Sequence, residues 1–423
     1  MLDYYAEIDK LGKQGFQAEL MVEKFASLKR IDDTGESFSL NRNTLGHGLR
    51  VIKGGKQGFA SSNTFDQALI DGAKNACSAA KRDKSNVIPA SDGVHKNARN
   101  FFKFKVEDAT EKSADFMSQL TAPLGAATIT SATVSIFNTD IKIINTEGVD
   151  VRELSSAFTY ELNANYRKGN KVTPEISEYR ASQSLLSNAD EIRACVKDKI
   201  EAVKIQRKPP KVDTVVFTPK GAASAMVYFL ESSFSGRELY FGTSPLSEGM
   251  NLDCKLSLTD DPTVKNSIPS VNFDDEGLPR KKIVLMEEGI IKNFLYNTYW
   301  SLKASKENNH SAWRADHRST PGISPTTIVI STKEEKSVTD GALVVDEVMG
   351  SESGDSTTGE FSLTPQVMWY DSGHGKVGAK DVMIRGNFKN LLAGIESMSY
   401  KNKSAYYGGV MTGDLRVNGL SVS

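Results

Sequence analysis

The sequence contains few residues of the types that most often bind transition metals. It has three cysteines and five histidines in 423 residues, and it lacks a CxxC, HExxH or HxH pair. A metal site needs at least two or three ligands at suitable spacing. The nearest arrangement is HSAWRADHR, which contains His310, Asp316 and His317. A helix would place the two histidines two turns apart, too far to share one tetrahedral ion, so we favour polar loop residues over a metal site.

Long apolar runs and an excess of one charge are also missing. No run approaches the roughly 20 residues that span a bilayer, and the acidic N-terminus, MLDYYAEIDKLGKQGF, lacks the features of a signal peptide. Lysine and arginine total 52 against 53 aspartates and glutamates, so no broad positive field favours nucleic acid. The scattered cysteines fit buried thiols in a reducing compartment. We therefore expect a soluble cytoplasmic protein that binds neither nucleic acid nor a membrane.

Sequence motifs for nucleophilic catalysis and phosphate binding are absent as well. There is no GxSxG elbow, and no cysteine has a histidine neighbour in the sequence. The glycine-rich stretches IKGGKQG, SGHGKVG and YYGGVMTGD lack the spacing of a phosphate-binding loop. These stretches predict hairpin turns instead.

The length of the chain and the position of its paired prolines indicate two domains. Single cores stop growing at roughly 250 to 300 residues, which this chain exceeds. The best boundary is the basic segment IQRKPPKVD, because its adjacent prolines exclude helix continuation. We therefore predict an α+β protein, with an α/β N-terminal domain at residues 1–210 and a β-rich C-terminal domain with few helices at residues 211–423.

Apolar periodicity locates the elements of the first half. Helices are expected near Leu2–Leu11, Thr64–Arg82 and Asp190–Val203, and Thr64 with Gln67 forms a capping-box pattern. Short strands are expected at SFSL and LRVI, separated by a GHG turn, and later alternating runs predict an antiparallel meander.

The second half combines one apolar helix with many strand patterns. Thr218 and Pro219 predict the start of a helix over GAASAMVYFLESSFSG. Glu288-Gly289 predicts a tight hairpin turn, because glycine supplies the positive φ that the turn requires. A further helix is expected at Phe388–Ser397.

Two acidic features of the second half are candidates for chemistry. Glu231 is the one carboxylate of the apolar helix, and Asp274, Asp275 and Glu276 form a cluster. Paired carboxylates can bind a hard cation or divide acid and base roles. The pattern DDEG-x-P is also typical of a turn, and Arg280 with two lysines follows to neutralise it. We favour the turn, and the solvent edge of a core helix for Glu231, with a cation-dependent enzyme as the alternative.

Several blocks of the chain resemble one known family. VNFDDEGLPRKKIVLMEEGIIKNFLYN resembles the signature of the TldD/TldE (PmbA) family, also labelled modulators of DNA gyrase, in which an acidic turn precedes a hairpin. GHGLRVIKGGKQGFASSN resembles the family's N-terminal module, and GDSTTGEFSL, VMIRGNFKNLLAGI and GDLRVNGLSVS resemble its C-terminal elements. The resemblance covers nearly the whole chain, with the blocks in the family's order.

The resemblance implies dimers of two-domain subunits. TldD-type members are zinc peptidases with HExxxH on the first helix of the C-terminal domain and a cysteine ligand near the C-terminus, whereas TldE-type members pair with them and lack these ligands. Here the corresponding helix has no histidine between Gly221 and Gly236, and no cysteine follows Cys254. The chain is therefore identified as a TldE/PmbA-like member. We expect no catalytic residue, no metal ligand and no cofactor in it, with zinc only in a TldD-like partner.

These observations predict a zinc-free subunit of a TldD/TldE-type metallopeptidase complex that processes or degrades peptides. Its partner would be a TldD-like subunit or a second copy of the chain. The alternative is a homodimeric peptide- or ligand-binding protein without hydrolytic activity. The acidic cluster and two family-matched positions supply the candidate substrate-binding residues, which are Asp274, Asp275, Glu276, Arg280, Phe361 and Asn387.

Overall fold

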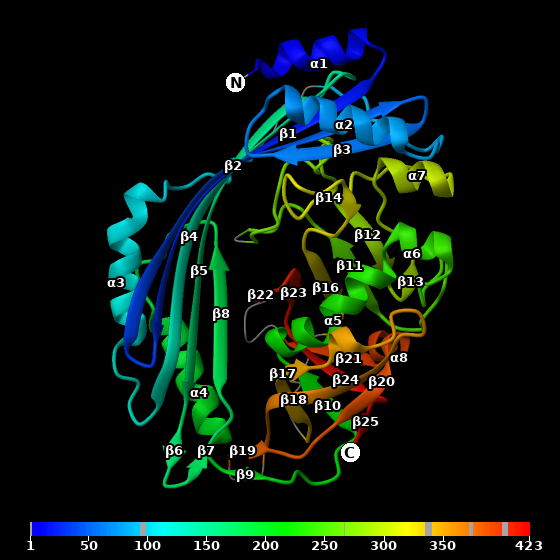
Figure 1. Ribbon diagram of the computed structural model, residues 1–423. Coiled ribbons are helices and arrows are strands. Elements are labelled where there is room, and N and C mark those ends of the chain that lie inside the picture. The colour runs from blue at the N-terminus through cyan, green and yellow to red at the C-terminus, as the bar shows by residue number, and fades with distance from the viewer. Residues whose placement is uncertain (1, 94–98, 266, 335–340, 372–374, 400–404) are drawn as a thin grey trace.

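The protein consists of a long N-terminal sheet joined to a β-rich C-terminal half, as the computed structural model shows (Figure 1). The structure describes residues 2–93, 99–265, 267–334, 341–371, 375–399 and 405–423. The predicted α+β class, with few helices in the C-terminal half, is confirmed. Within these ranges, no helix is both long and apolar enough to cross a bilayer.

The N-terminal sheet is antiparallel, with strand order β3-β2-β1-β4-β5-β8. The expected interruption at GHG is wrong, because β2 continues through it. A Cβ at Gly46 would lie 2.1 Å from the His317 ring, and one at Gly48 would lie 2.2 Å from the His317 carbonyl oxygen. These glycines therefore allow close packing rather than a turn. The strands are β1 Gln17–Asp33, β2 Glu36–Lys53, β3 Lys56–Ser62, β4 Thr128–Asn145, β5 Asp150–Asn165 and β8 Ile176–Ser182, with a small hairpin of β6 Arg167–Lys168 and β7 Lys171–Val172.

Helices cover one face of this sheet. Alternate residues of a strand share a face, so Leu20 and Leu28 of β1 point to the same side. Leu20 packs in a cluster with α1 and α2, and Leu28 packs in a second cluster with α3 and α4. Figure 1 shows α1 and α2 over the upper part of the sheet and α3 beside its lower part. The helices are α1 Tyr4–Lys13, α2 Gln67–Ala79, α3 Thr110–Thr121 and α4 Asp190–Val203, with a short 3-10 turn at Glu107–Ala109.

The start of α2 differs from the predicted capping box. Asp66 is the N-cap, and its Oδ1 accepts a hydrogen bond of 3.1 Å from the Leu69 backbone N–H. The Thr64 hydroxyl donates to the Asp66 carboxylate at 2.8 Å, so it supports the cap without forming it. A carboxylate next to the helix N-terminus also interacts favourably with the helix dipole.

The C-terminal half contains two larger sheets around α5. One sheet has the order β21-β24-β10-β17-β18-β19-β9, with β20 and β25 attached, and the other has the order β13-β12-β11-β16-β23-β22. The first comprises β9 Gln206–Arg207, β10 Thr214–Phe217, β17 Leu343–Met349, β18 Glu360–Asp371, β19 Lys376–Ala379, β20 Ile384–Asn387, β21 Ile395–Ser399, β24 Asp414–Asn418 and β25 Ser421–Val422. The second comprises β11 Leu256–Asp260, β12 Ile283–Glu287, β13 Ile290–Ile291, β16 Ile328–Thr332, β22 Ala405–Tyr407 and β23 Val410–Thr412, and a separate pair is β14 Ala312–Trp313 with β15 Gly322–Ile323. The helices are α5 Pro219–Ser233, α6 Gly236–Phe241, α7 Thr298–Ala304 and α8 Phe388–Ala393, with a 3-10 turn at Ser351–Ser353.

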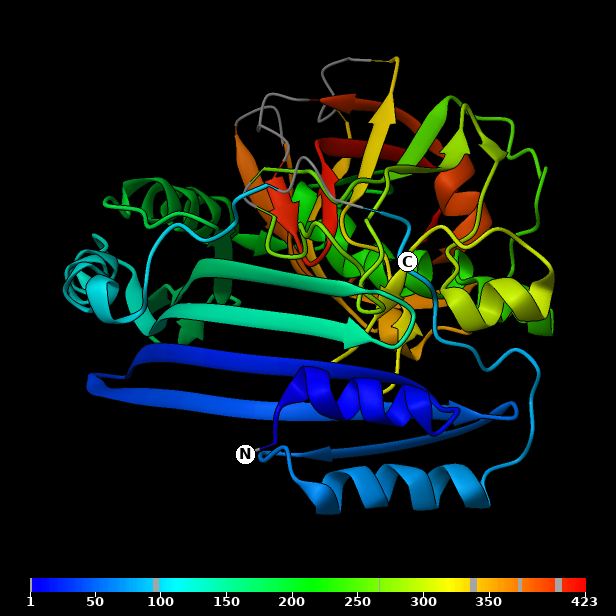
Figure 2. The ribbon, with the colours of Figure 1, turned by 90° about the horizontal axis from the view of Figure 1, so that it is seen from above.

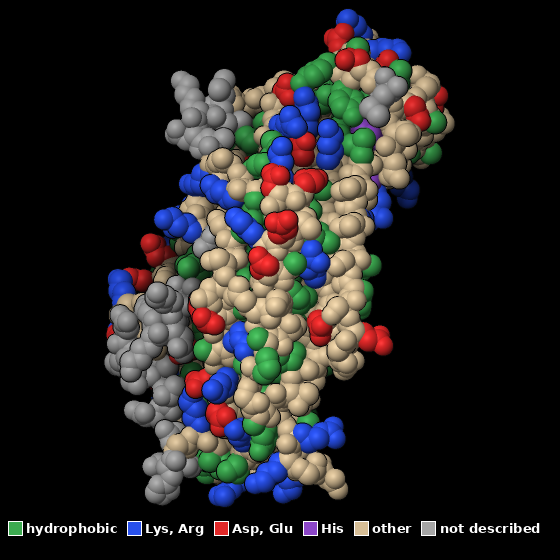
Figure 3. Space-filling view, turned by 90° about the vertical axis from the view of Figure 1, so that its left-hand side faces the viewer, with side chains coloured by type: hydrophobic (Ala, Val, Ile, Leu, Met, Phe, Trp, Pro, Cys, Tyr) green, Lys and Arg blue, Asp and Glu red, His purple; other side chains and the backbone are tan. Residues whose placement is uncertain are grey.

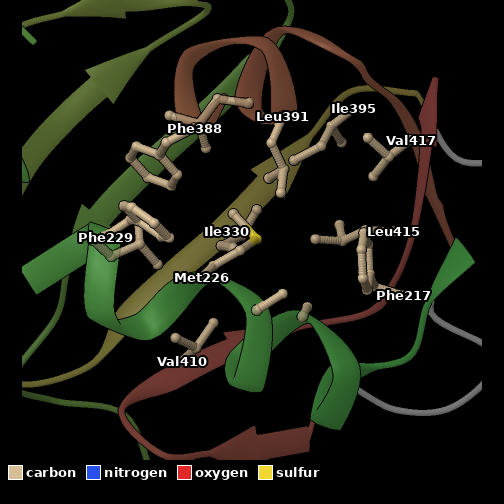
Figure 4. Close-up of a cluster of buried hydrophobic side chains, with 14 of the residues drawn as sticks. Phe217, Met226, Phe229, Ile330, Phe388, Leu391, Ile395, Val410, Leu415 and Val417 are labelled. Carbon is tan, nitrogen blue, oxygen red and sulfur yellow. The ribbon is translucent and has the colours of Figure 1, made fainter. Parts of the chain in front are cut away.

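Helix α5 forms the centre of the C-terminal core. Thr218 caps its first turn by accepting from the Gly221 N–H, as predicted. Met226 and Phe229 are fully buried and point toward side chains of the surrounding strands and of α8 (Figure 4). Phe229 stacks on Phe388, with ring centroids 5.3 Å apart. The apolar stripe of the sequence therefore packs as expected for a core helix.

The structure agrees with the predicted hairpin of the C-terminal half but shortens its last predicted helix. The hairpin at Glu288-Gly289 is confirmed, since both residues have positive φ, 46° and 83°. The helix expected at Phe388–Ser397 is only partly right, because α8 ends at Ala393 and β21 follows it directly. Residues of β21 pair with β24, and this sheet pairing overrides the helical periodicity.

The proposed domain boundary at residue 210 lies between β9 and β10, in a segment without helix or strand. The two halves nevertheless share buried contacts. Val196 and Ile200 of α4 belong to the same apolar cluster as Val216 and Val344 of the C-terminal sheet. The division into two domains therefore remains a prediction. Side chains from both sides of residue 210 pack in one apolar cluster.

Close packing of α2 on β3 gives a test of the fold. A Cβ at Gly58 would lie 2.1 Å from the Ala73 carbonyl oxygen, so we expect Gly58→Ala to lower the free energy of unfolding by about 1–3 kcal/mol. The matched control is Gly72→Ala on α2, whose added Cβ would meet only Ala60 at 3.4 Å. Because alanine favours helix, this control should be neutral or stabilising by up to about 1 kcal/mol. Urea denaturation measures both, and equal effects would contradict the packing.

Candidate functional site

A cleft of about 400 Å³ lies where the N-terminal sheet meets the C-terminal half. The uncovered face of the sheet contributes residues of β1 and β4, and the end of α5 contributes Glu231. The remaining walls come from loops of the C-terminal half. The cleft is lined by Met21, Glu23, Ile141, Glu231, Pro269, Val271, Phe273, Asp275, Arg280, Trp313, Arg314, Ala315, Asp316, Ser324, Pro325, Thr326, Gly408 and Gly409.

The acidic cluster at the back of the cleft is a tight turn, as the sequence favoured. Asp274 is buried, and its Oδ1 accepts hydrogen bonds from the backbone N–H groups of Glu276 at 3.0 Å and Leu278 at 2.9 Å. Gly277 has φ 78°, a conformation that glycine adopts without strain. Asp274 is therefore a structural residue of the turn and does not line the cleft.

Glu276 joins the turn to the N-terminal sheet through a buried ion-pair network. Arg50 of β2 donates to Glu19 of β1 at 2.9 Å and to Glu276 at 3.2 Å. Arg314 also pairs with Glu19. Burial opposes the charge on Glu19, but Arg50 and Arg314 outweigh it and hold the pKa of this carboxyl below its usual value. All four side chains are almost completely buried, so each charge depends on its partners.

Asp275 and Arg280 are the predicted residues that line the cleft. Asp275 accepts a hydrogen bond of 2.6 Å from the Arg314 backbone N–H, and burial raises the pKa of Asp275 although Arg314 opposes the rise. Arg280 donates to the carbonyl oxygens of Ala312 at 2.8 Å and Ser324 at 3.3 Å. Arg280 thus positions the segments that carry two walls of the cleft, while its side chain borders the cavity.

Glu231 lies in the cleft rather than only at a solvent edge. It is an exposed residue near the C-terminal end of α5, and it shares the cavity with Asp275 and Arg280. Desolvation by the surrounding protein raises the pKa of its carboxyl. The expected place of Glu231 at the solvent edge of the helix is confirmed by its exposure, and its position in the cleft is an addition that the local pattern does not show. The side chain could accept or release a proton beside a bound ligand.

Comparison with known proteins assigns the chain to a family. Residues 210–423 match the PmbA/TldA metallopeptidase C-terminal domain, and residues 36–82 match the PmbA/TldA metallopeptidase domain 1. The chain belongs to the PmbA/TldD family. Among its relatives, an uncharacterized protein of Methanocaldococcus jannaschii is 26% identical, with 89% of this chain and 90% of that protein covered. A Haemophilus influenzae protein described as a metalloprotease PmbA homolog is 22% identical, with 97% and 93% covered.

Solved structures show the same PmbA/TldD fold. TldE from Thermococcus kodakarensis superimposes with a TM-score of 0.88 at 21% identity, and 99% of each chain is covered. A Thermotoga maritima protein described as a modulator of DNA gyrase superimposes with a TM-score of 0.85 at 19% identity, covering 99% of this chain and 100% of that one. These likenesses extend over both halves of the protein.

The remaining candidates of this PmbA/TldD chain lie away from the cleft. Phe361 is buried in the C-terminal core, 5.9 Å from the Phe229 ring. Asn387 is the N-cap of α8 and accepts from the Lys389 N–H at 3.0 Å. Both positions have structural contacts that account for these residue types, and neither lines the cavity.

The histidines of HSAWRADHR do not converge. His310 lies 2.7 Å from the Pro279 carbonyl oxygen, whereas His317 lies 2.9 Å from the Glu23 carboxylate, and Asp316 pairs with Arg318. In the part of the chain that the structure describes, no three histidine, cysteine, aspartate or glutamate side chains gather as metal ligands would. His95 and His374 lie outside the described residues. The segment instead supplies Trp313 and Arg314 to the cleft, and no motif of the sequence marks these two residues as functional.

The buried network predicts a large stability loss on removal of Arg50. Arg50→Met keeps much of the side-chain volume but leaves Glu276 buried without its guanidinium partner. We expect a loss of about 3–5 kcal/mol in the free energy of unfolding, measured by urea denaturation. The control is Lys13→Met, which removes an exposed ion pair with Asp9 and should change stability by less than about 0.5 kcal/mol. A loss below about 1 kcal/mol for Arg50→Met would contradict the role of the network.

The stability of the protein should also depend on pH through the buried carboxyl of Glu153. Glu153 of β5 accepts from Asn272 beside the acidic turn, and burial raises its pKa to about 7. The folded state then holds this proton more tightly than the unfolded chain, so stability is full below about pH 4.5 and falls as pH rises toward 7. Glu153→Gln should remove this loss and be more stable than wild type by about 3 kcal/mol at pH 8, but not at pH 4.

Urea denaturation at pH 4, 6 and 8 measures the effect. Glu111→Gln, at an exposed position of α3, controls for the loss of one negative charge. An unchanged difference between Glu153→Gln and wild type from pH 4 to pH 8 would contradict the buried, protonated state of Glu153.

Proposed function

We propose that this chain is a zinc-free subunit of a TldD/TldE-type peptidase complex, in which it supports the catalytic subunit and helps to hold an extended peptide. The observation that carries the proposal is the composition of the cleft wall formed by α5. That helix has the place expected for a zinc-binding HExxxH helix, but it presents Glu231 and contains no histidine.

The chemistry of peptide hydrolysis supports this assignment. A zinc peptidase uses the metal to polarise the scissile carbonyl and to activate water, and a carboxylate to transfer the proton. Glu231 could perform only the last of these tasks. A partner with its own zinc site would supply the others, and we propose zinc as a cofactor of that partner alone.

The shape and lining of the cleft support a peptide as the ligand. A volume of about 400 Å³ lies in the usual range for ligand sites, where most of the lining is apolar and a few polar groups fix orientation. Val271, Phe273 and Trp313 supply apolar surface, while Asp275 and Arg280 supply opposite charges. Trp313 is 48% exposed, and this exposed aromatic on the short strand β14 is suited to cover an extended chain.

Surface charge supports a peptide rather than nucleic acid as the partner. Lysine and arginine side chains are interspersed with aspartate and glutamate on the face shown in Figure 3. Binding to a phosphate backbone requires a positive patch that can release counterions. We also propose a cytoplasmic location, as expected for an intracellular peptide-processing subunit.

Metal content and peptide binding test the proposal. The purified chain should contain less than about 0.1 zinc per molecule and should not cleave a fluorescein-labelled mixed decapeptide, and cleavage should require an added TldD-like subunit. Trp313→Ala should weaken binding of the decapeptide to the assembly about tenfold, because a buried aromatic contact contributes roughly 1–2 kcal/mol. Fluorescence anisotropy measures the binding.

Phe241→Ala is the matched control, since Phe241 is 57% exposed and does not line the cleft. About one zinc per chain together with cleavage by the chain alone would contradict the proposal. Decapeptide binding by a stable homodimer that gains no activity from a TldD-like subunit would favour the alternative, a binding protein without hydrolysis. A cation lost on Asp275→Ala would favour an enzyme that uses the acidic turn.

A further inference from the structure

The outer edge of β2 is a long stretch of strand without a neighbour. β3 pairs with β2 only from His47 to Lys53, whereas β1 pairs with β2 along its full length. Among the described residues, no strand pairs with the outer side of Glu36–Gly46. Figure 2 shows the blue β1–β2 hairpin extending well past β3 at this edge. Alternate backbone N–H and C=O groups of this stretch therefore point outward, available to another strand.

Two large apolar side chains of this edge face water. All residues from Glu36 to Asn43 are exposed, and they include Phe38, 47% exposed, and Leu40, 55% exposed. Soluble proteins usually protect such edges with lysine, proline, a bulge or a short strand. The stretch ESFSLNRN has neither lysine nor proline, and its register with β1 is uninterrupted. Glu36 and Arg42 are the only charged residues of the stretch, so the four positions from Phe38 to Asn41 carry no charge that would oppose strand addition.

The sequence of the edge is complementary to itself. If two copies of β2 pair antiparallel about Ser39, Phe38 of each copy lies opposite Leu40 of the other. The same register places Glu36 opposite Arg42. These four side chains lie on one face of the strand, because they alternate along it. The pairing therefore matches apolar with apolar and negative with positive on both sides of the two-fold axis, as isologous interfaces require.

We propose that the Glu36–Asn43 edge of β2 is an interface that pairs antiparallel with the same edge of a second copy of this chain. The two N-terminal sheets then form one continuous sheet across the dimer axis, with Ser39 at its centre. The interface lies outside the cleft and does not depend on the function proposed for the cleft. The choice of a second copy as the occupant rests on this self-complementarity, which pairs both the charged and the apolar side chains across one two-fold axis.

Charge reversal tests the pairing. Glu36→Arg alone and Arg42→Glu alone each place like charges opposite one another twice, so each should raise the dimer dissociation constant about tenfold. The double variant, Glu36→Arg with Arg42→Glu, restores opposite charges and should return the constant to within about threefold of wild type. Sedimentation velocity over a concentration series of the full chain measures all four proteins. Rescue by the double variant distinguishes pairing from damage to the fold.

Cross-linking tests the register. Ser39→Cys should form a disulfide-linked dimer under mild oxidation, because residues directly opposite in an antiparallel pair have Cα atoms about 4.5–5.5 Å apart, within the span of a disulfide. Ser37→Cys is the matched control, since two copies of position 37 would be about 14 Å apart in this register. The wild-type chain, with its three native cysteines, gives the background.

Three outcomes would overturn the proposal. The first is a monomer at concentrations up to about 100 μM, and the second is a dimer that neither single charge reversal weakens. The third is equal cross-linking by the Ser39→Cys and Ser37→Cys variants. Loss of binding to a TldD-like subunit, with the homodimer unchanged, would assign the edge to that partner and would also contradict the proposal.

Discussion

The pairing of Arg50 with Glu19 and Glu276 is the interaction on which the arrangement of this protein depends. It joins the N-terminal sheet to a turn that lies 226 residues later in the sequence. Buried charges cost free energy unless they are paired and hydrogen-bonded, so the network tolerates little displacement of either side. The cleft is bounded by these same two parts of the molecule, which the network joins.

The three carboxylates of the acidic turn have different roles. Asp274 stabilises the turn, Glu276 joins it to Arg50, and only Asp275 faces the cleft. Arg280 holds the neighbouring segments by hydrogen bonds to backbone carbonyls. The function that we propose for this member of the PmbA/TldD family, in which the cleft holds a peptide and a partner supplies the metal, requires such a division between structural and cleft-facing residues.

Sequence reasoning recovered what depends on local chemistry. The core helix with its Thr218 cap, the Glu288-Gly289 hairpin and the acidic turn follow from short-range patterns, and the structure confirms them. Features that depend on distant segments were not predictable. GHG resembles a turn but lies within β2, because His317 packs against its glycines. Glu231 is exposed at the edge of its helix as the local pattern predicts, but no local pattern indicates that the N-terminal sheet approaches it to form a cleft.

The buried ion pairs couple the sheet to the acidic turn, and disrupting them should loosen both sides of the cleft. Hydrogen exchange measured by mass spectrometry on Arg50→Met tests this directly under conditions where the variant remains folded. If the ion pairs couple these parts, exchange should be faster both in β1 and β2 and in the segments 274–280 and 311–317, with unchanged protection around α8 and β24. Faster exchange confined to β1 and β2, with the two cleft segments unaffected, would contradict this coupling.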